Sequence, residues 1–161
     1  MKNVLNLLML ALFLTFATSC STDSVDDLQL EDIIIPEAKT IELEIMDLIN
    51  NYRVKQGLTK LSNHDLVKSQ AFSHSDYMVE TENVSHANFY TRKFFLVNNA
   101  GANVVTENVA YGFTSAQSVV NAWINSDAHR SNIKGDYTNF DVSAEQNDEG
   151  KWYFTNIFIK K

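Results

Sequence analysis

The sequence has little cysteine, proline and glycine, and each shortage excludes a class of protein. The single cysteine, Cys20, has no partner in the chain for a disulfide and cannot build a zinc site of several thiolates. One proline and five glycines among 161 residues exclude a collagen-like chain and argue against a repeat array. With 45% apolar residues, a chain of this length can bury a hydrophobic core without covalent staples.

Positive charge is also scarce. Lysine and arginine number 13 against 20 acidic residues, which gives a net charge of −7 at pH 7. Nucleic-acid binding needs a basic surface that neutralises phosphates. Docking on an anionic bilayer by charge needs basic clusters as well. The composition therefore argues against a nucleic-acid partner and against electrostatic attachment to lipid.

Residues 1–19 are typical of an export signal. Lys2 precedes an almost wholly apolar run from Val4 to Phe16, and small residues then lead to Cys20. The run is short for a membrane span and suits a signal peptide. It resembles a bacterial lipoprotein signal, in which the cysteine is diacylated and becomes the new N-terminus. The alternative is an ordinary secretory signal with an incidental thiol.

Residues 20–35 form an acidic stretch, which we expect to be a tether from the lipidated Cys20. It contains five acidic residues and no basic one: Asp23, Asp26, Asp27, Glu31 and Asp32. An acidic stretch directly after the lipid cysteine also resembles the surface-export signal of Bacteroidetes lipoproteins. We therefore expect an exported cell-envelope lipoprotein, attached to an outer membrane and exposed at the surface. The alternative is that the stretch is only a solvated linker.

Residues 36–161 combine helical and strand periodicities. Apolar residues recur at helical spacing between Pro36 and Gly57. Further helices are predicted to begin near Ser62 and at Thr114, each with a capping-like signal. A short helix is expected over residues 91–98, and residues 82–90 look like loop. Strands are predicted at 102–106, 140–144 and 151–159, the last two joined by a turn. This mixture predicts a single α+β domain.

Three polar residues in separate segments are candidates for a site. His86 lies in the loop sequence NVSHANF, Glu107 begins ENVAYG, and His129 lies in NSDAHRSNI. Imidazole can act as acid, base or metal ligand near neutral pH, and a carboxylate beside it orients the ring. We predict that these groups converge on one cleft. The sequence contains no HExxH, GxSxG or phosphate-binding glycine loop.

Each candidate also has a structural explanation. His86 can be a loop histidine bonded to backbone, and Glu107 can accept backbone N–H groups in a turn. His129 and Arg130 can cap the C-terminal carbonyls of the preceding helix, and we favour that role for Arg130. His74 lies on the inward face of a helix, where a core histidine with satisfied hydrogen bonds is expected.

The order of these segments resembles the CAP superfamily of cysteine-rich secretory proteins, venom antigens and plant pathogenesis-related proteins, and most of all its cysteine-free bacterial branch. The resemblance covers residues 41–159. LINNYRVKQGLTKL and LVKSQAFSHSDYM match the first two helices, and VSHANF matches the loop with the first site histidine. GANVVTENVAYG matches a strand with a Glu-Asn signature. SAQSVVNAWINSDAHRSNI matches the third helix and the bacterial His-Arg segment that follows it, and WYFTNIF matches the last strand.

The resemblance implies an α-β-α sandwich with a central antiparallel sheet. It also implies a shallow cleft, which in many members holds two histidines and two acids. His86 and Glu107 correspond to family positions, and His129 follows from the bacterial pattern. The second acid has no counterpart, since Ser126 stands near its position, and Asp141 replaces a usual glycine.

Three functions are compatible with these residues. The first is a lipid-anchored module that binds a protein partner, a lipid or a sterol at the cell envelope, with no cofactor required. The second is a hydrolase or peptidase with His86, Glu107 and His129 as catalytic residues, in which His86 and His129 hold a divalent metal such as zinc. The third is a structural lipoprotein with a vestigial cleft.

Overall fold

The computed structural model describes residues 33–161. The predicted signal peptide, Cys20 and the tether up to residue 32 lie outside the described residues. Residues 33–161 form a compact unit that contains all the helices and strands of this range. The unit includes Ile33, ahead of the expected domain start at residue 36, because this side chain packs against the hydrophobic core.

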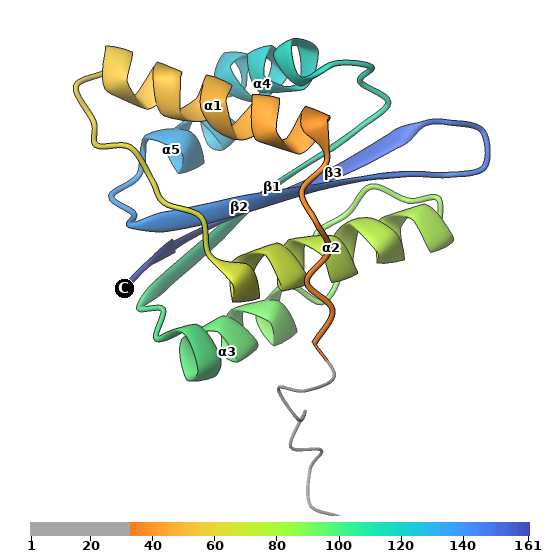
Figure 1. Cartoon of the computed structure of the whole chain (residues 1–161), viewed down its shortest axis with the longest axis horizontal. Helices are drawn as coiled ribbons and strands as arrows, with labels where there is room; N and C mark the ends of the chain where they lie inside the picture. The colour runs from red at the N-terminus through yellow and green to blue at the C-terminus, as the bar shows by residue number, and fades with distance from the viewer. Residues whose placement is uncertain (1–32) are drawn as a thin grey trace, which may run out of the picture. The chain divides into compact units, whose positions relative to one another are not determined.

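Residues 33–161 are arranged in three layers (Figure 1). Helices α1, α4 and α5 cover one face of the sheet, and α2 and α3 cover the other. This arrangement confirms the expected α-β-α sandwich. The elements are α1 (Thr40–Lys55), α2 (Asp65–Glu80), α3 (Phe89–Ala100), β1 (Val104–Tyr111), α4 (Ala116–Asn125), α5 (Asp127–Lys134), β2 (Asn139–Gln146) and β3 (Trp152–Lys160).

The sheet has the strand order β1-β3-β2, and both pairings are antiparallel. The predicted hairpin is confirmed as β2 and β3. The expected strand at 102–106 extends instead from Val104 to Tyr111, so ENVAYG belongs mainly to a strand and not to a turn. Helices cover both faces of β1, and its inner residues are therefore nearly all buried. That continuous burial hides the alternation by which a strand is recognised in a sequence.

The first helix begins at Thr40 and not at Pro36. The backbone N–H of Lys39 donates to the Glu42 carboxylate at 2.7 Å, which caps the helix at this point. The second helix begins at Asp65 and not near Ser62, because Ser62 forms a parallel bridge to β2. These differences move helix starts by a few residues and leave the layers as expected.

Two larger apolar clusters fill the two sides of the sheet. The first lies under α1 and α4 and includes Ile45, Ile49, Trp123 and Phe140. The second lies under α2 and α3 and includes Val67, Leu96, Val105 and Ile157. Since every one of these side chains is less than 5% exposed, each helix is held by a continuous buried face.

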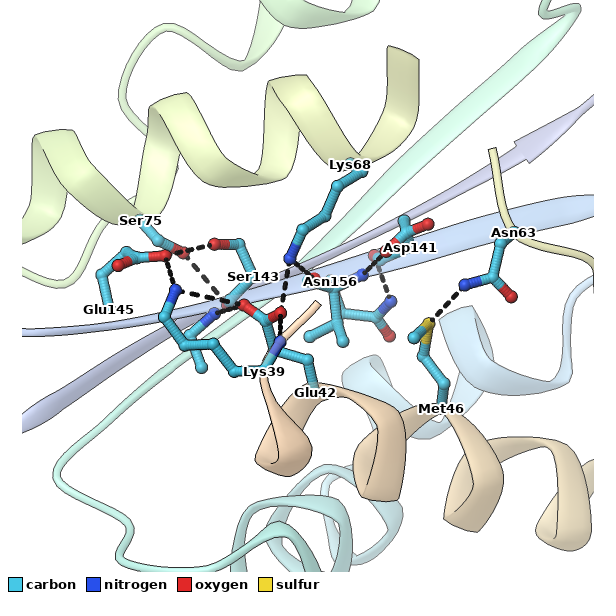
Figure 2. A network of polar contacts seen from close by, with 12 residues as sticks. Lys39, Glu42, Met46, Asn63, Lys68, Ser75, Asp141, Ser143, Glu145 and Asn156 are labelled. Atoms are coloured by element: carbon cyan, nitrogen blue, oxygen red, sulfur yellow. Dashed lines mark hydrogen bonds and ion pairs between the residues drawn. The ribbon is translucent and has the colours of Figure 1, made fainter. Parts of the chain in front are cut away.

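A buried polar network joins α1, α2 and β2 (Figure 2). Glu42 is fully buried and accepts hydrogen bonds from Lys68 Nζ at 2.6 Å and from the Ala144 backbone N–H at 2.8 Å. Lys68 also donates to the Val142 carbonyl at 3.0 Å. Both charges therefore keep hydrogen-bond partners after removal from water, as buried ions require.

Asp141 belongs to the same buried region but forms no ion pair within the described residues. Its carboxylate accepts the backbone N–H of Val142 at 2.9 Å and that of His64 at 3.4 Å. Burial raises the pKa of Asp141 to about 6, although these hydrogen bonds and Lys68 lower it in part. Its negative charge therefore costs stability at neutral pH.

We predict that Asp141→Asn increases the free energy of unfolding at pH 8 by about 2 kcal/mol. Because the folded pKa lies above the unfolded one, the stabilisation from the proton on Asp141 is complete below about pH 4 and is lost as the pH rises through 6. The gain should therefore shrink at pH 5. Urea unfolding at both pH values measures it. Asp76→Asn, on the exposed side of α2, is the control, and an equal gain at both pH values would contradict the assignment.

Candidate functional site

Glu107 is the centre of the candidate site. It stands in β1 opposite Ile157, and its side chain is only 1% exposed. Arg92 from α3 donates from Nε to Glu107 Oε2 at 2.9 Å and from Nη2 to Oε1 at 3.0 Å. Two parallel hydrogen bonds of this kind fix both the position and the plane of the carboxylate. The buried negative charge is therefore compensated within the fold.

His86 forms the third contact to this carboxylate, with 2.8 Å between His86 Nδ1 and Glu107 Oε1. A carboxylate only accepts hydrogen bonds, so Nδ1 carries the proton and donates. In the neutral ring, the other nitrogen, Nε2, then has a free lone pair. Since the His86 side chain is 54% exposed, Nε2 is presented to solvent as a hydrogen-bond acceptor or base.

The loop that carries His86 is held on both sides of this residue. The Ser85 carbonyl accepts a hydrogen bond from His74 Nε2 at 2.7 Å, and the Ala87 carbonyl accepts one from Arg92 Nη1 at 2.7 Å. Asn88 then adopts a left-handed conformation with φ 58°, which asparagine tolerates, and the chain turns into α3. The backbone at His86 is therefore fixed by side chains from α2 and α3.

His74 is a buried support beneath the site. It is 2% exposed, and its Nε2 lies 3.8 Å from Glu107 Oε1. Burial lowers the pKa of His74, although Glu107 partly opposes this shift. The neutral ring donates from Nε2 to the loop, so His74 is a core histidine as expected. Only one ring nitrogen is satisfied, since Nδ1 is buried without a hydrogen-bond partner in the described part of the chain.

His129 lies in α5, a helix that the sequence did not predict as a separate element. It is half-buried, and burial lowers its pKa, with a smaller decrease from the neighbouring His86. The two histidines are thus near enough to influence each other. Within the described residues His129 forms no side-chain hydrogen bond to His86 or Glu107. The structure therefore joins His86 and Glu107 directly and places His129 at the edge of the site.

Arg130 has the structural role that we favoured. Its Nη1 donates to the Ile124 carbonyl at 2.8 Å near the C-terminus of α4, and Nη2 pairs with Asp127. Cations are stabilising at this end of a helix. The arginine thereby connects α4 to α5 away from Glu107.

Asparagines connect β1 to α5 behind the site. The Asn132 side-chain amide donates to the Asn108 side-chain oxygen at 2.8 Å and to the Glu107 carbonyl at 3.2 Å. Asn108 in turn donates to the His129 carbonyl at 3.1 Å. This chain of amides holds α5, and with it His129, beside the strand that carries Glu107.

Sequence reasoning did not identify Arg92 or Asn132. Arg92 shares a helix face with Phe95 and Leu96, at spacings of three and four residues, and all three are buried. An arginine on the buried face of a helix needs an acidic partner. The spacing could therefore have predicted that Arg92 forms a buried ion pair. Asn132 had no such signal, because its contacts come from another segment of the chain.

The side chains at the site do not supply the ligands of a resident zinc ion. Both Glu107 oxygens are engaged by Arg92 and His86. No group of three or more histidine, cysteine or acidic side chains within residues 33–161 is arranged to hold a metal. His86 Nε2 and His129 provide at most two nitrogen ligands, whereas protein zinc sites use three or four.

The order of the helices and the antiparallel three-stranded sheet define the fold class as an α-β-α sandwich. The family model described as CAP, the cysteine-rich secretory protein family, matches residues 46–158. The chain belongs to this family.

Two curated relatives come from Bacillus subtilis. The uncharacterized membrane protein YlbC is 32% identical over 129 residues, which cover 76% of this chain and 35% of that protein. The uncharacterized protein YkwD is 33% identical over 95 residues, which cover 57% of this chain and 37% of that protein. The chain therefore spans little more than a third of the length of either relative.

Solved bacterial structures share the fold. An outer surface protein from Borrelia burgdorferi aligns with a TM-score of 0.66 at 22% identity, over 73% of this chain and 90% of that one. An extracellular SCP-domain protein from Bacillus anthracis aligns with a TM-score of 0.65 at 25% identity, over 74% of this chain and 40% of that one. None of the helices in residues 33–161 combines the length and the apolar character that crossing a membrane requires.

We predict that Arg92→Met decreases the free energy of unfolding by about 3 kcal/mol, because Glu107 then remains buried without its cation. Chemical denaturation at pH 7 measures the loss. Arg130→Met is the matched control, since its ion pair is exposed and the expected loss is about 1 kcal/mol or less. Equal losses in the two variants would contradict the central role of the Arg92–Glu107 pair.

Proposed function

We propose that this protein is a lipid-anchored, extracytoplasmic binding module whose site at His86 recognises a ligand or partner at the cell envelope. The observation that carries the proposal is the exposed Nε2 of His86, whose ring is oriented by the buried Glu107. A fixed acceptor on a rigid loop loses little freedom when a ligand binds. A lipid, a sterol or a protein partner is the expected class of ligand.

Binding suits this geometry better than hydrolysis. The Glu107 side chain is 1% exposed, and both of its oxygens already accept hydrogen bonds. It therefore orients His86 and, because it is buried, does not face a substrate itself. Ser126 stands near the position where many family members have their second acid. A recognition site needs no second acid, whereas a two-carboxylate mechanism does.

A metal-assisted hydrolase or peptidase that uses His86, Glu107 and His129 is the second candidate. One observation favours it, namely the Nδ1–carboxylate hydrogen bond that leaves Nε2 as a base, as a histidine general base requires. Such an enzyme would have to recruit its metal through His86 Nε2, His129 and the substrate.

The location is part of the proposal. The lipoprotein-like signal ends at Cys20, and the similar structures include an outer surface protein and an extracellular protein. One curated relative is named as a membrane protein. These observations support export and attachment at the envelope, with the domain facing away from the cytoplasm.

Replacement of the lipidation cysteine tests the anchor. We expect Cys20→Ser to abolish incorporation of labelled fatty acid and to prevent signal cleavage at residue 19. Metabolic labelling and the mass of the mature chain are the measurements. Ser21→Ala, at the adjacent residue, is the control and should retain both. Labelled fatty acid on the Cys20→Ser chain would contradict lipidation at this residue.

Replacement of the exposed histidine tests the site. Protein purified from its own envelope should retain an extractable ligand, and His86→Ala should decrease the retained amount roughly tenfold, as expected for loss of a central contact. His64→Ala is the control, because His64 lies at the start of α2 outside the site. Mass spectrometry of the extract measures both.

The outcome separates the candidate functions. Equal retention by the two histidine variants would contradict recognition at His86, and no retained ligand would favour a vestigial cleft. A zinc-dependent rise in Tm that His86→Ala abolishes would favour the hydrolase.

A further inference from the structure

Helix α3 presents an apolar face to solvent. Tyr90 is 83% exposed, Phe94 70% and Val97 40%. These residues are spaced by four and three positions and lie on one side of the helix, and we call them the α3 face. The opposite side of α3 packs Phe95 and Leu96 into the core. The other side of α3 thus holds the helix on the core, and the α3 face remains available to contact an apolar partner.

The described chain begins on the same layer. Ile33 packs against the apolar cluster that contains Leu96. Phe89, at the start of α3, packs against the same cluster. Ile34 and Ile35 follow and are 65% and 47% exposed. Figure 1 shows the segment after residue 32 running across α2 toward α1. The expected tether therefore joins the domain on the layer of α2 and α3, with two further apolar side chains at the junction.

The charge of α3 differs from that of the whole chain. The helix contains no acidic residue, although the chain carries a net charge of −7. Arg92 is buried against Glu107, so Lys93 is the basic residue of α3 that remains for an outside partner. Lys93 is adjacent to Phe94, so its ammonium can reach toward phosphate while its methylenes lie along apolar surface. Tyrosine and phenylalanine beside lysine are typical of helices that lie in the interfacial region of a bilayer.

We propose that the α3 face rests on the bilayer to which Cys20 is anchored. This inference rests on the proposed lipid anchor. The twelve residues between Cys20 and Ile33 allow a span of at most about 45 Å, so an anchored domain remains close to the lipid surface. Contact through α3 also brings the loop before this helix, which contains His86, near the headgroup region. A ligand of His86 can then enter directly from the membrane.

A second copy of the chain is a poorer occupant of this face. Aromatic side chains bury about 150–250 Å² each, so Tyr90 and Phe94 together supply about 300–500 Å², which is less than the roughly 800 Å² per partner of a stable protein interface. A bilayer needs no such area, because the anchor already supplies the affinity.

Tryptophan quenching on anchored protein tests the contact. The chain from residue 20 onward, which contains the whole compact unit, is coupled through Cys20 to a maleimide lipid in phosphatidylcholine vesicles. Phe94→Trp reports on the α3 face. Leu43→Trp is the matched control, because Leu43 is 51% exposed on α1, in the opposite layer. Trp123 and Trp152 contribute the same background to both variants.

We expect brominated phosphatidylcholine to quench the tryptophan at position 94 roughly twofold more than the one at position 43, because interfacial helices bury their apolar face by about 5–10 Å. Equal, weak quenching would overturn the inference. So would concentration-dependent dimerisation of soluble protein that Phe94→Ser abolishes, which would assign the face to a second copy. In this experiment Cys20 is attached to the lipid chemically, so weak quenching would contradict only the contact through α3. The natural lipid anchor is tested separately by the fatty-acid labelling of Cys20.

Discussion

The ion pair between Arg92 and Glu107 is the constraint on which the site depends. A carboxylate placed in the middle of a covered strand is stable only with a cation and hydrogen bonds around it. Arg92 supplies both, and it also holds the Ala87 carbonyl. One guanidinium thus ties together β1, α3 and the loop between α2 and α3. The orientation of His86 is a consequence of this arrangement.

The protein has a second buried polar region, and the two differ in how completely their charges are compensated. Glu42 and Lys68 neutralise each other within 2.6 Å, much as Glu107 and Arg92 do. Asp141 has only hydrogen bonds to backbone N–H groups, and burial raises its pKa. The pH dependence of stability should therefore come partly from a residue outside the candidate site.

Local patterns predicted the fold better than its boundaries. The hairpin, the α2 and α3 helices and the α-β-α layers follow from periodicity and from the resemblance to the CAP family. The start of α1 does not, because Glu42 caps the helix after Pro36. Strand β1 was also too short in the prediction, since burial on both faces removes the alternation of a half-buried strand.

The candidate site was predictable only in part. His86 and Glu107 were paired correctly, and His74 was correctly placed in the core. The role of Arg92 depends on a contact between α3 and β1, and neither segment alone reveals it. His129 was expected in the same cleft, but the separate helix α5 holds it at the edge. Side-chain partners from distant segments thus limited the prediction.

The family assignment does not by itself specify an activity, so the proposed function is argued from the chemistry of one ring. If Glu107 orients His86, that ring presents a lone pair to solvent on a loop with little freedom. The same loop leads into α3, the helix that carries the α3 face.

The most direct test of this account is the tautomer of His86 in the folded protein, measured by nitrogen-15 NMR of the imidazole ring above its titration range. Hydrogen bonding to Glu107 predicts a single neutral tautomer with the proton on Nδ1. That proton should also exchange slowly with solvent. A proton mainly on Nε2, or a rapidly exchanging mixture of both tautomers, would contradict the account.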